Sequence, residues 1–205
     1  MKKPIRTGPF FTHADGKLSV VTSACTIGLK ELCKGKFGEL ATHTGGWFLF
    51  DDGSVEYFEA LMDKGWTGPE PIEKVVEWSK AHPKRRLRMY DMTDVCGFTA
   101  DDVARRYEMA LQRKDVWKYS KAQLGLHLRI ARLFRRILGR SLFKPSVRSV
   151  ICSECESQLL NNPPYFDVLR ACAVPDFDLI DPAMLERVTV ESGGQIFHYK
   201  ELNAA

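Results

Sequence analysis

The sequence predicts an α+β domain in which an antiparallel sheet packs against helices, and three observations lead to this class. Residues 42–60 contain two apolar, alternating stretches around Asp51-Asp52-Gly53, which is the pattern of a β-hairpin. Proline and capping signals elsewhere mark the starts and ends of helices. The chain of 205 residues is long enough for one domain with its own core, and no linker composition interrupts it. We therefore expect one domain over residues 1–205.

Composition narrows the class of protein. The hydrophobic content of 44% and the charged content of 27% are typical of globular proteins and exclude disordered and fibrous classes. The apolar stretch at residues 18–32 is broken by polar residues and glycine, so we expect no membrane span. The basic start of the chain is not followed by an apolar segment, so we expect no secretory signal and a cytoplasmic protein. In that compartment the six cysteines are expected to be reduced.

The elements follow in order along the first half of the chain. Residues 18–22 are rich in β-branched side chains and predict a first strand, followed by a loop and a short helix. After the hairpin, residues 69–81 predict a helix with prolines in its first turn, and residues 86–91 predict a further strand. Thr99 is the expected N-cap of a helix that continues to residue 112.

The second half begins with a long basic helix over residues 121–138, which Gly139 ends. A β-leaning stretch at residues 147–151 precedes a short helical pattern that opens at Cys152. Another short helix is expected to start at Pro182, and residues 189–199 are expected to form a last hairpin around Ser192-Gly193-Gly194.

The hairpin loop fixes which side chains share a face. A loop of three residues, with Gly53 in the left-handed conformation, pairs Phe50 with Ser54, and counting back places Glu59 opposite Gly45. His43 lies two residues further back on the same face, at about 7–8 Å from Glu59 as its diagonal neighbour.

Glu56 is the alternative carboxylate on the same strand. With the three-residue loop it opposes Phe48 and points to the other face, because strand side chains alternate. A two-residue loop would turn Glu56 to the face of His43, but some six residues away along the strand, about 20 Å. Glu59 is therefore the residue expected to orient His43.

Cys152 is the most informative residue of the chain. At a helix N-terminus, the unpaired N–H groups and the helix dipole favour the thiolate, which is the nucleophilic form of cysteine. An activated cysteine also needs a base and a group that orients this base, and His43 and Glu59 are of the required types. Attack on a carbonyl carbon would give a thioester, with the backbone N–H of Cys152 as one oxyanion donor.

These motifs also resemble a known family. Thr42-His43-Thr44-Gly45 before a hairpin, then Phe58-Glu59-Ala60, then Ile151-Cys152-Ser153-Glu154 are similar to the circularly permuted papain-like NlpC/P60 proteins, in particular the YiiX/YaeF-like group. The resemblance covers roughly residues 18–188. It implies a permuted papain-like fold, an antiparallel sheet or small barrel packed against helices, with Cys152 as nucleophile, His43 as base and Glu59 as the third polar residue.

The resemblance also bears on the reaction. The family includes peptidases and amidases that act on cell-wall peptides, and relatives that are lipid acyltransferases or thioesterases. The expected function is therefore a cysteine hydrolase that cleaves an amide bond, with a murein peptide as the expected substrate. Two alternatives stay open: an acyltransferase or thioesterase with the same triad, and a non-catalytic binding protein that docks through the arginine-rich helix.

Each candidate residue has a second interpretation. Cys152 can be a buried structural thiol, and Cys152 with Cys155 forms a Cys-x-x-Cys pair typical of redox or zinc sites. No second such pair exists in the sequence, so we expect no metal and no cofactor. His43 can be a structural histidine of an edge strand. The other histidines have no carboxylate placed by a comparable argument: His13, His82, His127 and His198.

The basic helix over residues 121–138 is amphipathic. Such a pattern is typical of a helix with one core face and one solvated face. Alternatively, Arg129, Arg132 and Arg136 can contact an anionic surface such as lipid or acidic wall polymer. No aromatic and basic stacking pattern accompanies these arginines, and the net charge of +4 is mild, so we expect no nucleic-acid partner.

Overall fold

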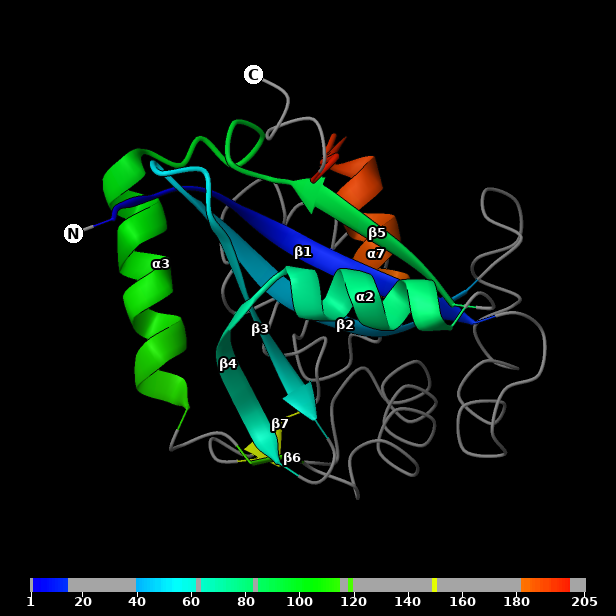
Figure 1. Cartoon of the computed structure of the whole chain (residues 1–205). Helices are drawn as coiled ribbons and strands as arrows, with labels where there is room; N and C mark the ends of the chain where they lie inside the picture. The colour runs from blue at the N-terminus through cyan, green and yellow to red at the C-terminus, as the bar shows by residue number, and fades with distance from the viewer. Residues whose placement is uncertain are drawn as a thin grey trace, which may run out of the picture.

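The computed structural model describes residues 2–14, 40–61, 64–82, 85–114, 118–119, 149–150 and 182–199, and this part of the chain is α+β, as predicted (Figure 1). A six-stranded antiparallel sheet has the order β4-β3-β2-β1-β5-β8. Its strands are β1 (Pro4–Ala14), β2 (Leu40–Phe50), β3 (Val55–Leu61), β4 (Gly65–Pro71), β5 (Arg85–Asp91) and β8 (Gln195–Ile196). The described helices are α2 (Glu73–Ala81), α3 (Ala100–Arg113) and α7 (Pro182–Glu191).

The helices cover both faces of the sheet. One face packs against α2 through a core that includes Phe10, Trp47 and Tyr57. The opposite face packs against α3 around Phe48 and Phe58, and against α7 through a cluster described below. Figure 1 shows α2 in front of the strands and α7 behind them. Neighbouring strand residues therefore contribute to different cores, as the alternation of side chains requires.

The predicted hairpin is confirmed in its loop and in its register. The Phe50 amide donates to the Ser54 carbonyl oxygen at 2.9 Å, and Gly53 adopts the left-handed conformation at φ 80°. Gly45 pairs with Glu59, as counted from the sequence. The three-residue loop therefore sets the faces of the paired residues 45–49 on β2 and 55–59 on β3.

The helix α3 begins at the predicted cap. The Thr99 hydroxyl accepts a hydrogen bond from the Asp102 amide, and the Asp102 carboxylate accepts one from the Thr99 amide. This reciprocal arrangement is a capping box, which satisfies two donors that the first helical turn leaves open.

The end of α7 shows that the expected hairpin over residues 189–199 is wrong. The helix continues to Glu191. At its end the Gly193 N–H donates a hydrogen bond to the Val190 carbonyl and the Gly194 N–H to the Thr189 carbonyl, with Gly193 at φ 95°. This is a Schellman end, in which glycine takes the left-handed position without steric cost. The following strand β8 pairs with β5 and not with a preceding strand.

Two further expectations need correction. A strand already spans Pro4–Ala14, so residues 18–22 do not hold the first strand, and they themselves lie outside the described residues. The expected helix at residues 69–81 begins only at Glu73, because Pro69 and Pro71 belong to β4. Among the described strands of the sheet, β4 has only β3 as a neighbour, and an edge strand tolerates prolines.

The strand over residues 86–91 is confirmed as β5 and the helix start at Pro182 as α7. The basic helix at residues 121–138 and the helix that opens at Cys152 lie outside the described residues. In the described part of the chain, no helix combines the length and the apolar character needed to cross a bilayer.

Candidate functional site

The centre of the candidate site is a histidine and a glutamate on neighbouring strands. Nε2 of His43 on β2 lies 2.8 Å from Oε2 of Glu59 on β3. The two residues are diagonal neighbours, since Glu59 pairs directly with Gly45. Both side chains are partly exposed, His43 at 24% and Glu59 at 15%. The predicted approach of these two residues is therefore confirmed.

The imidazole of His43 rests against an aromatic ring. The ring of Phe10 on β1 meets it edge-on, with the centroids 6.4 Å apart. Gly45 makes this approach possible, because a Cβ at this position would lie 2.5 Å from the Phe10 ring and 2.3 Å from the carbonyl oxygen of Phe58. The absence of a side chain opposite Glu59 thus leaves space for the ring that supports His43.

Glu59 is held by its neighbours on β3 and β4. The Thr67 hydroxyl donates to the backbone carbonyl of Glu59 at 3.0 Å, which links the two strands at this position. Tyr57 lies two residues earlier on the same face. Burial, then the nearby carboxylates of Glu59 and Glu70, raise the pKa of Tyr57 to about 12. Tyr57 therefore stays neutral at ordinary pH and adds no negative charge beside Glu59.

The contact defines the chemistry that His43 can perform. A carboxylate oxygen only accepts hydrogen bonds, so in this contact Nε2 of His43 carries the hydrogen and donates a hydrogen bond to Glu59. In the neutral ring, the other nitrogen, Nδ1, is then the basic one. A proton taken up at Nδ1 gives an imidazolium that the Glu59 carboxylate stabilises. An imidazole held in this way can act as a general base, with the carboxylate as its orienting group.

Cys152 lies outside the described residues, but the strand just before it is described. β7 (Ser149–Val150) pairs in parallel with β6 (Lys118–Tyr119). β6 in turn lies against β3 and β4, and Figure 1 shows β6 and β7 near the end of β3. β7, which ends two residues before Cys152 in the sequence, is thus linked through β6 to the strand that carries Glu59.

Glu56 lies on the other face of β3, as expected from its pairing with Phe48. Its carboxylate accepts a hydrogen bond from the hydroxyl of Tyr107 on α3 at 2.5 Å and pairs with Lys2 at 2.5 Å. Glu56 therefore connects the sheet to α3 and is separated from His43 by the sheet itself.

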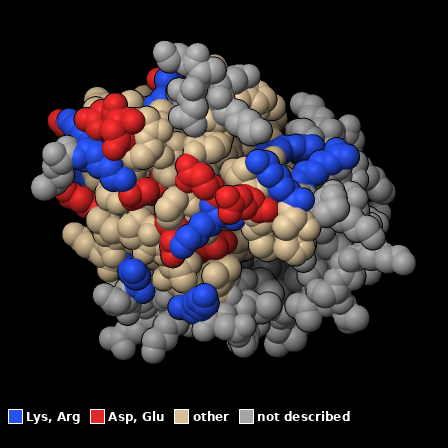
Figure 2. Space-filling model, viewed as in Figure 1, with Lys and Arg blue, Asp and Glu red and all other residues tan. Residues whose placement is uncertain are grey.

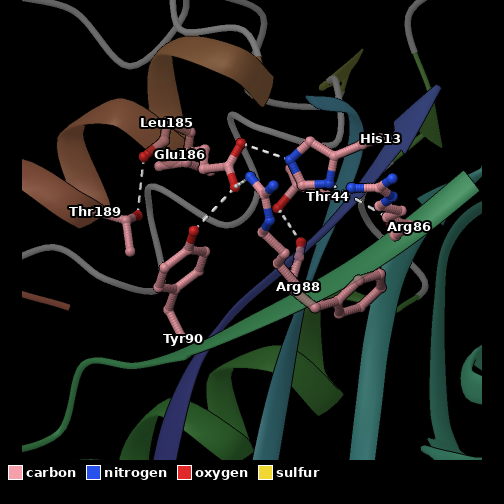
Figure 3. Close-up of polar contacts among 9 residues, drawn as sticks. His13, Thr44, Arg86, Arg88, Tyr90, Leu185, Glu186 and Thr189 are labelled. Carbon is pink, nitrogen blue, oxygen red and sulfur yellow. Dashed lines mark hydrogen bonds and ion pairs between the residues drawn. The ribbon is translucent and has the colours of Figure 1, made fainter. Parts of the chain in front are cut away.

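Sequence reasoning missed a second histidine and glutamate pair. Nε2 of His13 on β1 lies 2.7 Å from Oε2 of Glu186 on α7, and both side chains are buried (Figure 3). The signal for this pair was Glu186 itself. Glu186 is a charged residue that is buried in α7 together with apolar residues such as Leu185 and Val188.

The surface on the side of α2 carries mixed charge. Figure 2 shows acidic side chains across the middle of this face and basic side chains around them. Glu70 and Lys74 form one ion pair there. The arginines expected to contact an anionic surface, Arg129, Arg132 and Arg136, lie outside the described residues.

Comparisons with known proteins give no relative for this chain. No family model, no curated protein and no solved structure matches it.

Proposed function

We propose that the protein is a cysteine hydrolase that cleaves an amide bond through a thioester intermediate, with Cys152 as nucleophile, His43 as base and Glu59 as the orienting residue. The observation that carries the proposal is the hydrogen bond between His43 and Glu59. An activated cysteine needs a base and a group that orients the base. His43 and Glu59 are residues of these two types, and the hydrogen bond between them supports this assignment.

The reaction follows from the roles of these groups. Nδ1 of His43 accepts the thiol proton of Cys152, and the thiolate attacks the carbonyl carbon of the substrate. The C–N bond breaks when the imidazolium returns this proton to the leaving amine, and the acyl group remains on sulfur as a thioester. Water then attacks the thioester with His43 as base, which releases the acid and restores the thiol.

Two features support a place for Cys152 beside this pair. The chain reaches Cys152 from β7, which is linked through β6 to the strands β3 and β4. The order of the three motifs is that of the permuted papain-like NlpC/P60 proteins, so we infer their fold for the whole chain. The same resemblance supports a murein peptide as the substrate.

The test uses the purified protein with murein peptides and, separately, with acyl esters. Released amine is quantified, and the mass of the protein is measured for an acyl adduct on Cys152. The variants are Cys152→Ala and, as the matched control in the same segment, Cys155→Ala. Amine release and the adduct are expected in the wild type and in Cys155→Ala, and neither is expected in Cys152→Ala.

Each other outcome has a defined meaning. Turnover of acyl esters without any amine release would replace the amidase by an acyltransferase or thioesterase. Undiminished amine release by Cys152→Ala would refute the proposal. Stoichiometric binding of the peptides without turnover would favour a binding protein.

A further inference from the structure

The second histidine and glutamate pair belongs to a buried cluster between the sheet and α7 (Figure 3). Nε2 of His13 lies 2.7 Å from Oε2 of Glu186. The other carboxylate oxygen of Glu186 accepts a hydrogen bond from the Tyr90 hydroxyl at 3.0 Å and lies 3.5 Å from the guanidinium of Arg88. His13 is 1% exposed and Glu186 is 3% exposed. Both oxygens of one buried carboxylate are thus bound to residues of the sheet.

The apolar surroundings of this cluster join α7 to β1 and β2. Met184, Leu185 and Val188 of α7 form a core with Phe11, Ala41 and Tyr90. Nδ1 of His13 lies 3.3 Å from the carbonyl oxygen of Arg86 on β5. A buried carboxylate is costly unless its partners stay in place, so the cluster holds β1, β5 and α7 in one arrangement.

An irregularity in the sheet lies directly beside His13. Thr12 pairs with His43, but the next residue, His13, pairs with Ala41, so Thr42 is an extra residue in β2. This is a β-bulge, a feature that re-aims the side chains of a strand and is frequent next to active sites. The bulge lies directly next to His43 of the candidate site.

The bulge allows two different requirements to be met by one strand. Ala41 must face α7 with His13, whereas His43 must face Phe10 and Glu59 on the other side of the sheet. In a regular pairing His13 would oppose residue 42, and Ala41 would turn to the other face, because a shift by one residue exchanges the faces. A fixed partner for His13 therefore opposes a shift of the bulge.

We propose that His13 and Glu186 act as positioning residues for His43. By fixing β1 against α7 where β2 bulges, the buried pair keeps His43 on the face of Glu59, although neither residue reaches the site. The catalytic consequence rests on the proposed function, whereas the effect on the position of His43 does not.

The test compares His13→Ala and Glu186→Gln with Thr7→Val. The Thr7 hydroxyl donates a hydrogen bond to the Trp47 carbonyl at 2.9 Å. Thr7→Val therefore also removes a buried hydrogen bond between β1 and β2, but at the opposite end of these two strands. Two quantities are measured by nuclear magnetic resonance. One is the exchange of the backbone amides of residues 40–44 and of residues 47–50, and the other is the nuclear Overhauser effect between the His43 and Phe10 rings.

In both cluster variants, amide exchange at residues 40–44 is expected to accelerate about tenfold more than at residues 47–50, since local opening starts where support is lost. The Overhauser effect between the two rings is expected to weaken. Thr7→Val should show the reverse order of exchange and keep the contact between the rings.

An equal acceleration at both ends, with an unchanged contact between the rings, would overturn the proposal and leave the cluster as a general stabiliser. If His13→Ala does not fold, Glu186→Gln and the milder Tyr90→Phe give the same comparison, because both retain the volume of the buried side chain. A negative result in these exchange and Overhauser measurements does not bear on the amidase test. Conversely, a negative amidase test does not bear on these measurements.

Discussion

His13 and His43 lie on neighbouring strands and are offset by a single residue in register, yet their rings lie on opposite faces of the sheet and each contacts a glutamate. The two contacts measure 2.7 Å for His13 with Glu186 and 2.8 Å for His43 with Glu59. Exposure separates their roles, because the His13 side chain is 1% exposed and that of His43 is 24% exposed. Of the two pairs, only the second is open to solvent.

Glu59→Gln is expected to lower kcat by about 10²- to 10⁴-fold, because an amide does not stabilise the imidazolium as a carboxylate does. The free energy of unfolding should change by less than about 1 kcal/mol, since an ion pair with solvent contact contributes little. The measurement is steady-state amine release together with urea unfolding.

Glu56→Gln is the matched control on the same strand. Its side chain contacts Tyr107 and Lys2 on the other face, so this variant should retain its turnover. An equal loss of kcat in both variants would contradict the assignment of Glu59.

Gly45→Ala is expected to destabilise the protein by about 1–3 kcal/mol, because the new methyl group would overlap the Phe58 carbonyl oxygen and the Phe10 ring. Gly53→Ala is the comparison. A Cβ at Gly53 would meet no atom within 4 Å, so the positive φ alone disfavours alanine there, at a cost of about 1 kcal/mol. Urea unfolding measures both variants, and a smaller loss for Gly45→Ala than for Gly53→Ala would show that β2 and β3 can separate without cost.

Stability is expected to fall as pH rises above the ordinary tyrosine range. Burial and then nearby Glu59 raise the pKa of Tyr57 to about 12, and burial followed by Glu186 raises the pKa of Tyr90. Above about pH 10 the unfolded chain loses these protons while the folded chain keeps them, so each tyrosine lowers the unfolding free energy by about 1.4 kcal/mol per pH unit.

The window for Tyr57 extends from about pH 10 to its folded pKa near 12. Urea unfolding between these pH values measures the slope of the unfolding free energy against pH. Tyr90→Phe should make this slope shallower by the contribution of one tyrosine. An identical slope in the wild type and in this variant would mean that Tyr90 ionises as easily in the fold as in the unfolded chain.

Thr99→Ala removes the side chain that caps α3 and is expected to cost about 1 kcal/mol of unfolding free energy. Thr99→Ser retains a hydroxyl at the same position and should lose much less. The difference is measured by urea unfolding, and equal losses in the two variants would show that the hydroxyl does not stabilise the helix start.

The hairpin was predictable because its information is local. Asp51-Asp52-Gly53 defines the loop, the loop defines the register, and the register places Glu59 beside His43. The N-cap at Thr99 was predictable for the same reason, since a capping box depends on four consecutive residues.

The parts that sequence reasoning missed depend on distant neighbours. β1 contains Pro4 and Pro9, which argue against a strand, but β5 pairs with β1 only from Phe10 onward. Among the described strands, the proline-bearing half is therefore paired with β2, and the segment after β5 forms hydrogen bonds with it at Thr7 and not at either proline, so the prolines are tolerated. Likewise, His13 acquires its carboxylate partner from α7, which follows far along the chain, and no local pattern links the two residues.

The reactivity of Cys152 toward a small thiol-directed electrophile tests the central claim most directly. Near neutral pH, mass spectrometry of wild-type protein alkylated for increasing times should show Cys152 labelled far faster than Cys96 and the other cysteines. In His43→Ala this advantage should disappear while the labelling of Cys96 stays the same. Labelling of Cys152 at the rate of the other cysteines, or an advantage that survives His43→Ala, would contradict an activated thiol paired with His43.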